Sequence, residues 1–283
     1  MPNILNNKVA IITGSSRGIG AGIAERFAAE GAKVVLVART SEPGGKLPGS
    51  LDETAARIRA KGGDCLCVQA DLGSESDRER IVAETVAHYG GVDILVNNAA
   101  WARFAPSYSQ PPERVQLAYS VNFFAPLHLS QLVIPLMKTR GGGWILNLSS
   151  ATSDIPAPAP YDPNDRAYRF HTTHSPTLYG STKAALERMS TGMAIEVAAD
   201  NIAVNTLAPV EAVASEGAVK SGSIDDIAHM EPIEAMAEAA LALCSRPQNT
   251  LSGRISLSLP LLRELGVQVM CLDGASQLPD FTL

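Results

Sequence analysis

A tyrosine and a lysine lie four residues apart in the segment LYGSTKAALE, residues 178–187. If this alanine-rich segment is helical, Tyr179 and Lys183 share one helix face. A phenol has a reference pKa of about 10, and a neighbouring ammonium group favours its ionised form, so the pair could exchange a proton with a substrate. The same spacing also fits an ordinary amphipathic helix, in which the tyrosine packs and the lysine reaches solvent. The surrounding sequence has to decide between the two interpretations.

A second segment with chemical potential is TGSSRGIG, Thr13 to Gly20, which follows a short apolar run. Gly14 would allow a tight turn, Gly18 would let the backbone approach a pyrophosphate, and Gly20 would permit close packing of a helix on a strand. The helix that follows would direct its N-terminal N–H groups and the positive end of its dipole at the anion. Because the glycines stand between a strand pattern and a helix pattern, they predict a dinucleotide-binding site.

The elements that must position these two segments alternate along the whole chain. Apolar, β-branched runs predict strands, and segments with helical spacing and a glycine stop predict helices. This alternation predicts an α/β fold, a single Rossmann-type domain over residues 1–283, with a doubly wound parallel sheet, right-handed crossovers and helices on both faces. The predicted strands are 8–14, 33–38, 64–72, 92–100, 142–150, 202–209 and 266–274, and the predicted helices are 22–32, 51–63, 76–91, 112–138, 178–199 and 232–245.

Three segments interrupt this alternation of strands and helices. A Pro/Gly-rich insertion at about 40–50 separates the second strand from its helix, and a longer Pro-rich insertion at 151–177 precedes the Tyr179 helix. The segment at about 210–228 is poor in bulky apolar residues and follows the sixth strand, which predicts a substrate lid. Long loops in compact domains are usually functional or mobile.

Composition excludes several classes of protein. The net charge of −6 and the pI near 5.4 argue against a general nucleic-acid binder, which needs a basic surface. Four cysteines in 283 residues do not form a disulfide framework. We find no export signal and no apolar stretch near the ~18 residues of a membrane span, so we expect a soluble, cytoplasmic protein without a membrane span.

Several independent motifs stand in the order found in short-chain dehydrogenases/reductases. The chain has Thr13-Gly14 followed by Gly18 and Gly20 where that family has TGxxxGxG, and NNAA at 97–100 where it has NNAG. YGSTK at 179–183 resembles the family's catalytic tyrosine and lysine. The sequence is therefore similar, over nearly its whole length, to the single-domain type of this family, with an extended loop before the catalytic tyrosine.

The resemblance implies a role for each candidate catalytic residue. Tyr179 would be the general acid/base, and Lys183 would lower its pKa and hold the nicotinamide ribose. Ser150 would hydrogen-bond the substrate oxygen; we prefer it to Ser149 because the second serine of such a pair usually fills this role in the family. Asn122, in the segment YSVNFFAP, would position a water molecule beside Lys183 for proton relay.

The nucleotide preference is predicted from two arginines. The second strand ends with Arg39 and has no acidic residue there to bind ribose hydroxyls, while Arg17 lies in the glycine loop. Guanidinium groups suit a 2′-phosphate, so NADP(H) is the predicted cofactor. The predicted cofactor-binding residues are Gly14, Ser16, Arg17, Gly18, Ile19, Gly20, Arg39, Asp71, Leu72, Asn97, Asn98, Tyr179, Lys183 and Pro209.

The predicted partner is a small-molecule substrate, a bulky or hydrophobic carbonyl compound or the corresponding alcohol. Its site would lie beyond the carboxyl ends of the strands, lined by Trp101, Phe104, Ser150 and Val210 and by aromatic residues of the 151–177 insertion. We therefore expect an NADP-dependent carbonyl reductase or alcohol dehydrogenase acting on a hydrophobic ketone or aldehyde. A second hypothesis is an NADP-binding regulatory or scaffold protein without turnover.

Two further expectations concern metals and assembly. His171 and His174, with Asp162 and Asp165, do not follow a known zinc pattern, so we expect a polar loop and no metal. The helices near 112–138 and 178–199 resemble the family's dimer-forming pair, so a homodimer or homotetramer is expected by analogy.

Overall fold

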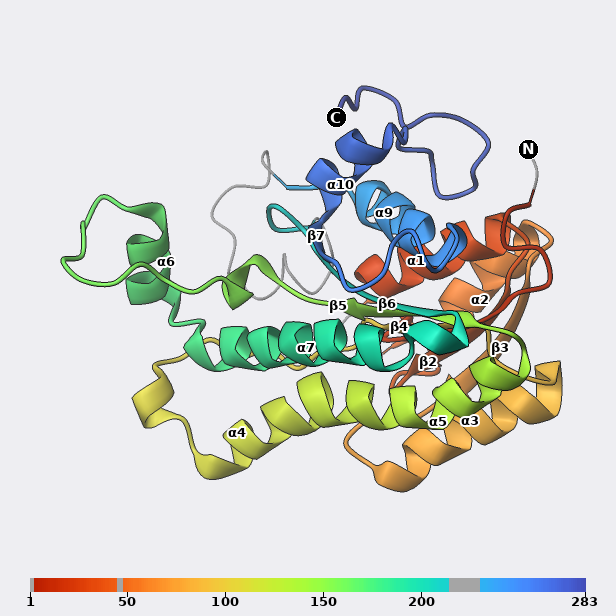
Figure 1. The fold of residues 1–283 in the computed structure, drawn as a ribbon, viewed down its shortest axis with the longest axis horizontal. Coiled ribbons are helices and arrows are strands. Elements are labelled where there is room, and N and C mark those ends of the chain that lie inside the picture. Colours follow the sequence, from red (N-terminus) through yellow and green to blue (C-terminus); the bar gives the residue numbers. More distant parts are fainter. Residues whose placement is uncertain (1–2, 45–47, 214–229) are drawn as a thin grey trace.

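A seven-stranded, entirely parallel sheet forms the centre of the computed structural model, which describes residues 3–44, 48–213 and 230–283 (Figure 1). The strand order is β3-β2-β1-β4-β5-β6-β7, and every neighbouring pair is parallel. The predicted doubly wound sheet is thus confirmed. The strands are β1 (Val9–Thr13), β2 (Lys33–Ala38), β3 (Asp64–Gln69), β4 (Ile94–Asn97), β5 (Gly143–Leu148), β6 (Ile202–Ala208) and β7 (Ile255–Leu257).

Helices cover both faces of the sheet. On one face lie α1 (Gly18–Ala29), α2 (Leu51–Ala60), α9 (Ile233–Ser245) and α10 (Ser258–Leu265); on the other lie α3 (Glu75–Tyr89), α4 (Pro112–Tyr119), α5 (Ala125–Thr139) and α7 (Thr177–Glu196) (Figure 1). Each face has its own apolar core. Phe27 and Met236 are buried in the first core, and Leu129 and Met193 in the second. Because both faces are covered, the strands are continuous apolar runs.

The sheet has a point at which the direction of winding reverses. Strand β1 pairs with β2 on one side and with β4 on the other, so Ile11 lies beside both Val35 and Leu95. In open α/β sheets a ligand binds in the crevice outside the carboxyl ends of the strands at this point. The glycine loop after β1 and the asparagines after β4 therefore meet at one crevice.

The last predicted strand is wrong. Residues 266–274 do not join the sheet; β7 is Ile255–Leu257, beside Thr206–Ala208 of β6. Gly266 ends α10 in a left-handed conformation, and Met270 forms only an isolated bridge with Gln277. The segment resembles a strand because apolar residues alternate in it, but Val269 packs into the core between the helices instead.

The predicted insertion at 151–177 contains regular structure. It holds a short 3-10 turn, η3 (Ala151–Ser153), and a helix, α6 (Arg166–His174), which lies at the end of the molecule beyond α7 (Figure 1). Asp165 caps α6 by accepting a hydrogen bond from the Tyr168 N–H at 2.9 Å. The predicted lid at about 210–228 falls outside the described residues except for 210–213.

The predicted helix at 112–138 has an interruption. A π-helical turn, η2 (Ser120–Phe124), joins α4 to α5. By length and composition alone, the 28-residue run Pro112–Thr139 could cross a membrane, because one 18-residue window within it has a mean hydropathy of 1.3. In this structure α5 packs on α3, β4, β5 and β6, and α4 packs on α7, so the helix belongs to the layer that flanks the sheet.

Candidate active site

The glycine loop after β1 is closed by contacts that leave no room for side chains. Gly14 has a φ of +69° and Gly18 a φ of +55°, values that favour glycine. A Cβ on Gly14 would lie 2.8 Å from the Cα of Ala99, and one on Gly20 would collide with the Gly14 carbonyl and the Asn98 side chain. The loop therefore needs glycine at Gly14 and Gly20, where the backbone itself comes into close contact with neighbouring atoms.

The asparagines after β4 hold this loop in place. The Asn98 side-chain amide donates to the Thr13 carbonyl at 2.8 Å, and the Asn98 backbone N–H donates to the Thr13 hydroxyl at 3.0 Å. Asn97 donates to the Asn147 side-chain oxygen at 2.8 Å. The carboxyl ends of β1, β4 and β5 are thus joined by buried and partly buried hydrogen bonds at the point where a ligand would enter.

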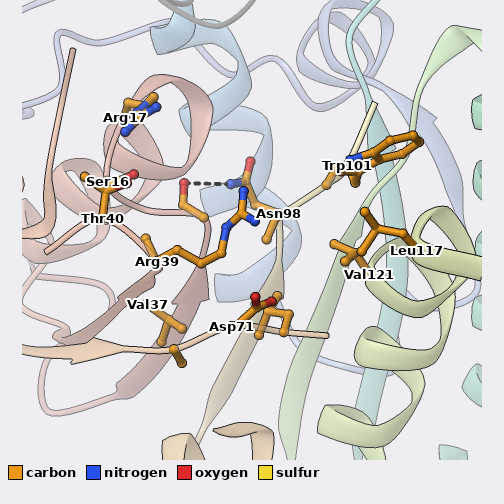
Figure 2. Close-up of a pocket in the computed structure, with 16 residues that line it drawn as sticks. Ser16, Arg17, Val37, Arg39, Thr40, Asp71, Asn98, Trp101, Leu117 and Val121 are labelled. Atoms are coloured by element: carbon orange, nitrogen blue, oxygen red, sulfur yellow. Dashed lines mark hydrogen bonds between the residues drawn. The ribbon is translucent and has the colours of Figure 1, made fainter. Parts of the chain in front are cut away.

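A cavity of about 240 Å³ lies over these strand ends. Figure 2 shows Arg17 and Arg39 on one side of it and Trp101, Leu117 and Val121 on the other. The predicted cofactor residues that line it are Gly14, Ser16, Arg17, Arg39, Asp71, Leu72 and Asn98. Sequence reasoning missed Leu117 and Val121, although the position of Val121 beside Asn122 was a usable signal.

Both arginines in this cavity offer positive charge to a ligand. Arg17 donates to the Gly49 carbonyl at 2.9 Å, while its buried Nε has no partner among the described residues. The Arg39 guanidinium has no hydrogen bond or ion pair within the part of the chain that the structure describes. Because Gly49 belongs to the 40–50 insertion, that insertion positions Arg17.

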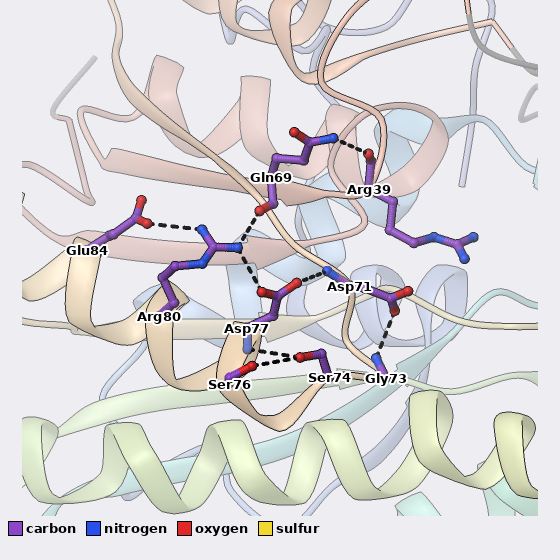
Figure 3. Close-up of polar contacts among 9 residues, drawn as sticks. All are labelled: Arg39, Gln69, Asp71, Gly73, Ser74, Ser76, Asp77, Arg80 and Glu84. Atoms are coloured by element: carbon purple, nitrogen blue, oxygen red, sulfur yellow. Dashed lines mark hydrogen bonds and ion pairs between the residues drawn. The ribbon is translucent and has the colours of Figure 1, made fainter.

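A polar network ties Arg39 to Asp71 (Figure 3). The Gln69 side chain donates to the Arg39 carbonyl at 3.0 Å, and Arg80 donates to the Gln69 carbonyl at 2.7 Å. Arg80 also pairs with Asp77 at 3.0 Å, and Asp77 accepts the Asp71 backbone N–H at 2.7 Å. This N–H, aided by Arg80, lowers the pKa of Asp77. The network joins β2, β3 and the start of α3 below the cavity.

Tyr179 and Lys183 line a second cavity, of about 260 Å³, with Ser149. Its other lining residues include the predicted Gly18, Ile19, Gly20 and Pro209. Arg17, Asn98 and Ala100 line both cavities, so the two adjoin. Sequence reasoning missed Met236 of α9 in this wall. The structure thus brings the glycine loop and the tyrosine–lysine pair, more than 150 residues apart in the sequence, to one continuous depression.

The electrostatics of the pair differ from the prediction. The buried Lys183 ammonium donates to the Leu148 carbonyl at 2.6 Å and lies 5.6 Å from the centre of the Tyr179 ring. Tyr179 keeps some exposed surface, yet protein atoms crowd its hydroxyl, and burial raises its pKa to about 12. Burial also lowers the pKa of Lys183 to about 8, against the opposing effect of Glu187. In the protein without cofactor, burial therefore raises the Tyr179 pKa, whereas we expected Lys183 to lower it.

Asn122 is buried in the π-helical turn η2, a kind of turn common at functional sites. Its side-chain oxygen accepts from the Trp101 N–H at 2.8 Å, and its amide donates to the Trp101 carbonyl at 2.9 Å and the Thr182 hydroxyl at 3.0 Å. Thr182 in turn donates to the Tyr179 carbonyl at 2.7 Å. Asn122 therefore orients the loop after β4 and the start of α7. Its predicted water-binding role stays a prediction.

The two serines after β5 have different surroundings. Ser149 lines the second cavity and donates to the Glu187 carboxylate. Ser150 begins η3, and its hydroxyl oxygen accepts two hydrogen bonds from Thr152, at 3.2 and 3.0 Å. A Cβ on Gly180 would collide with the Thr152 carbonyl, so η3 packs directly on α7 next to Tyr179. The insertion thus leaves and returns at the same rim, and the role of Ser150 stays a prediction.

Aromatic rings extend from Tyr179 towards the insertion. The Phe104 ring lies 5.9 Å from the Tyr179 ring and 6.2 Å from the Phe170 ring of α6, measured between centres. Phe170 in turn lies 4.9 Å from His174. The predicted residue Trp101 instead lines the nucleotide cavity. Phe104 and Phe170 form an apolar wall beside the reacting tyrosine, which sequence spacing alone did not place.

Two contacts fix the segment after β6. Arg166 of α6 forms a two-bond ion pair with Glu211, at 3.0 and 2.6 Å. The backbone N–H of Val210, a predicted substrate residue, donates to the buried Glu231 carboxylate at 3.0 Å. The insertion and the exit of β6 are therefore tied together on the substrate side of the crevice.

The polar residues of the insertion have local structural roles. Asp165 caps α6, and His174 stacks on Phe170. Elsewhere in the described chain, Glu75, Glu79 and His128 bring possible metal ligands within 4.8 Å of one another. However, the Arg78 guanidinium donates to His128 Nδ1 at 3.0 Å, and none of the three residues lines either cavity. We assign no metal to this cluster.

Comparison with known proteins agrees with this geometry. The sequence pattern of the short chain dehydrogenase family matches residues 8–161. Hydroxysteroid dehydrogenase-like protein 2 of Danio rerio is 33% identical over 96% of this chain, which spans only 63% of that relative's length. The chain belongs to the short-chain dehydrogenase/reductase family.

Two solved structures show the same fold. A short chain dehydrogenase from Mycobacterium thermoresistibile is 33% identical, with a TM-score of 0.78 over 97% of this chain and 94% of its own. A 7α-hydroxysteroid dehydrogenase, solved with NADH and 7-oxo glycochenodeoxycholic acid, is 32% identical, with a TM-score of 0.75 over 90% of this chain and 94% of its own.

Proposed function

We propose that this protein is an NADP-dependent oxidoreductase that interconverts a hydrophobic ketone or aldehyde and the corresponding alcohol. The observation that carries the proposal is the junction of the two cavities. One holds two arginines beside a glycine loop, and the other holds Tyr179 and Lys183. A dinucleotide along the crevice would reach from the first to the second.

The residues of the crevice fit this cofactor. The loop at Gly14 and Gly20 has space only for backbone, which suits close contact with a pyrophosphate at the start of α1. Arg17 and Arg39 would hold a 2′-phosphate. Because a relative of similar fold was solved with NADH, the choice of NADP rests on these two side chains. When bound, the cofactor would supply the hydride and, in its oxidised form, a positive charge beside the phenol.

The protein side chains would handle the proton. A phenol is protonated at neutral pH, and burial raises the pKa of Tyr179 further, so its hydroxyl can donate to the oxygen of a carbonyl undergoing reduction. Lys183, protonated below a pKa of about 8, stabilises the phenolate that remains. In the opposite direction the phenolate accepts the proton of the alcohol. Ser150 would hold the substrate oxygen.

The substrate end supports an apolar carbonyl compound. Phe104 and Phe170 build a wall beside Tyr179, and apolar walls with few polar groups are typical of small-molecule sites. The names of the relatives, which refer to hydroxysteroids, agree with a hydrophobic substrate. The chain covers less than two thirds of its first curated relatives, so this proposal concerns the activity of this domain.

We also propose a homodimer or homotetramer, supported by exposed apolar side chains on the flanking helices. Phe124 of η2 is 53% exposed and Ile195 of α7 is 80% exposed. Sedimentation of the purified protein at several concentrations would test this. Cytoplasmic localisation stays a prediction.

The proposed chemistry is tested by Tyr179→Phe, which removes only the phenolic hydroxyl. A hydrophobic ketone is first chosen by screening a panel of carbonyl compounds for NADPH oxidation by the natural protein. We expect Tyr179→Phe to lower turnover of this ketone by about 10²–10⁴-fold. NADPH affinity, measured by nicotinamide fluorescence, should stay within about threefold of that of the natural protein. The reason is that loss of one hydroxyl hydrogen bond costs only about 0.5 kcal/mol of binding free energy.

Near-normal turnover by the Tyr179→Phe variant would contradict the proposed mechanism. Tight NADPH binding by the natural protein, with no turnover on any member of the panel, would favour a regulatory or scaffold protein. Tyr89→Phe is a matched control, because the Tyr89 hydroxyl pairs with Asp64 outside both cavities.

A further inference from the structure

Glu187 extends the tyrosine–lysine row by one more helical step. It follows Lys183 by four residues on α7, as Lys183 follows Tyr179. Residues at this spacing lie on one helix face. The proposed reaction described above uses Tyr179 and Lys183 but leaves the carboxylate of Glu187 without a role.

The Glu187 carboxylate is bonded to serines on both sides of Ser150. Its Oε1 accepts from the Ser149 hydroxyl at 2.5 Å and lies 2.8 Å from the Ser153 hydroxyl. Ser153 also lies within hydrogen-bond distance of the Ser150 carbonyl, at 2.7 Å. A single carboxylate oxygen thus ties α7 to the segment that carries both candidate serines.

These bonds distinguish the two serines as donors. A hydroxyl has one proton to donate, and Ser149 donates its proton to Glu187. The Ser150 oxygen accepts both of its bonds, from the backbone N–H and the hydroxyl of Thr152. Ser150 therefore keeps its proton for another acceptor, whereas Ser149 does not.

The same carboxylate acts on the buried lysine. Burial opposes the charged form of Lys183, and Glu187 favours it. Two other ionisable side chains line the same cavity as Lys183: Tyr179, on its own helix, and Arg17, from the glycine loop. His174 is separated from Tyr179 by the rings of Phe170 and Phe104. The neighbouring parts of η2, β5 and η3 contribute the neutral groups Asn122, Leu148 and the serines.

We propose that Glu187 is a positioning residue that keeps Lys183 in its ammonium form and holds the Ser149 hydroxyl, so that Ser150 is the serine that donates to the substrate oxygen. The first half of this proposal, the effect of Glu187 on the charge of Lys183, can be tested without turnover. The second half, the role of Ser150, rests on the proposed function.

The first half is tested by Glu187→Gln, which keeps the shape and removes the charge. Titration of Lys183 Nζ by NMR, in protein labelled with ¹⁵N-lysine and assigned through Lys183→Arg, should give a midpoint lower by about 1 pH unit. Glu187→Asp, which keeps a carboxylate, should bring the midpoint most of the way back to that of the natural protein. An unchanged midpoint in a folded Glu187→Gln variant would overturn the proposal.

A matched control is Glu196→Gln, which removes an exposed carboxylate further along the same helix. It should leave the Lys183 midpoint unchanged. An equal shift in this variant would mean that net charge, and not Glu187, sets the protonation of Lys183. If Glu187→Gln does not fold, Glu187→Asp carries the test, because a carboxylate moved back along its side chain should give a smaller downward shift.

The second half is tested by alanine variants of the two serines. Their turnover is measured with NADPH and a ketone that the natural protein reduces. Ser150→Ala should lower turnover by about 10²-fold, and Ser149→Ala by less than about threefold, the worth of one ordinary hydrogen bond. The reverse order would overturn the assignment. In Glu187→Gln the fall in rate at alkaline pH should begin at a lower pH, because Lys183 loses its proton earlier.

Failure of the proposed function has a different signature. If no ketone is reduced but the Lys183 midpoint still falls in Glu187→Gln, the electrostatic role of Glu187 stands and the oxidoreductase activity does not.

Discussion

The two ends of the crevice are held by different kinds of contact. At the nucleotide end, backbone meets backbone: Gly14 lies against Ala99, and Gly20 against the Gly14 carbonyl. At the reacting end, side chains from distant segments meet, such as Glu187 with Ser149 and Phe104 with Phe170. The first end is specified by a local pattern of glycines. The second is specified by pairs of residues that no short motif contains.

This difference has a functional consequence. A phosphate-binding loop made of backbone changes little when surface side chains change, because glycine geometry fixes it. A wall made of side chains can be altered one residue at a time. We therefore expect substitutions at the nucleotide end to act on cofactor binding and stability together, and substitutions at the aromatic wall to act on substrate binding alone.

Among the variants that compare the two ends of the crevice, the largest effect should come from Gly20→Ala. The added Cβ meets the Gly14 carbonyl and the Asn98 amide, so backbone must shift. Overpacking of this kind costs about 1–3 kcal/mol, which would weaken NADPH binding by about 10- to 100-fold. Fluorescence titration with NADPH and thermal unfolding should both report the change.

The control for this variant is Gly192→Ala in α7, where the added Cβ meets only the flexible end of Arg188, at 3.0 Å. Alanine is favoured over glycine within a helix by about 1 kcal/mol, so this variant should be slightly more stable and bind NADPH normally. Equal losses in the two variants would contradict the importance of the loop geometry.

A smaller effect is expected from Arg39→Asp. It replaces a guanidinium group that has no partner in the described structure with a carboxylate that repels a 2′-phosphate and suits ribose hydroxyls. The ratio of NADPH to NADH affinity should fall by at least about tenfold, the worth of one charged hydrogen bond. An unchanged ratio would count against the nucleotide assignment. Arg59→Asp, on α2, is a surface charge change for comparison.

The smallest effect should come from Phe170→Ala on the insertion. Removal of one ring from the wall should raise KM for a hydrophobic ketone by about 3- to 10-fold, since an aromatic pair contributes about 0.5–1.5 kcal/mol. The affinity for NADPH should not change, because Phe170 lines neither cavity. A loss of NADPH binding equal to the rise in KM would show that the two ends are not independent. Tyr108→Ala, at an exposed ring, is the control.

The sequence patterns correctly predicted the parallel sheet and the glycine turn between β1 and α1, since both depend on local periodicity and glycine spacing. They failed at residues 266–274, where alternation that resembles a strand serves packing of Val269 between helices. They also missed α6, because proline-rich flanks concealed a helix that Asp165 caps. A pattern records which residues alternate, but not which surface they pack against.

At the other end, the sequence predicted that Tyr179 and Lys183 lie close together on one helix, as the structure has them, but it did not predict that burial raises the pKa of the tyrosine. The spacing showed that an ammonium is near, whereas burial of the Tyr179 hydroxyl, which raises its pKa, depends on how distant segments pack around it, Phe104 among them. Glu187 could have been found from the sequence, since it continues the same spacing of four. Its serine partners could not, because their position depends on how the chain returns after η3.

The contact between the Thr152 carbonyl and Gly180 has a consequence for how the protein could evolve. It anchors the root of the insertion to the turn of α7 that carries Tyr179, so we expect that residues beyond the anchor can be lengthened, shortened or exchanged without moving Tyr179. If the proposed function holds, substrate preference could therefore change at the outer part of the insertion while the position of Tyr179 is kept.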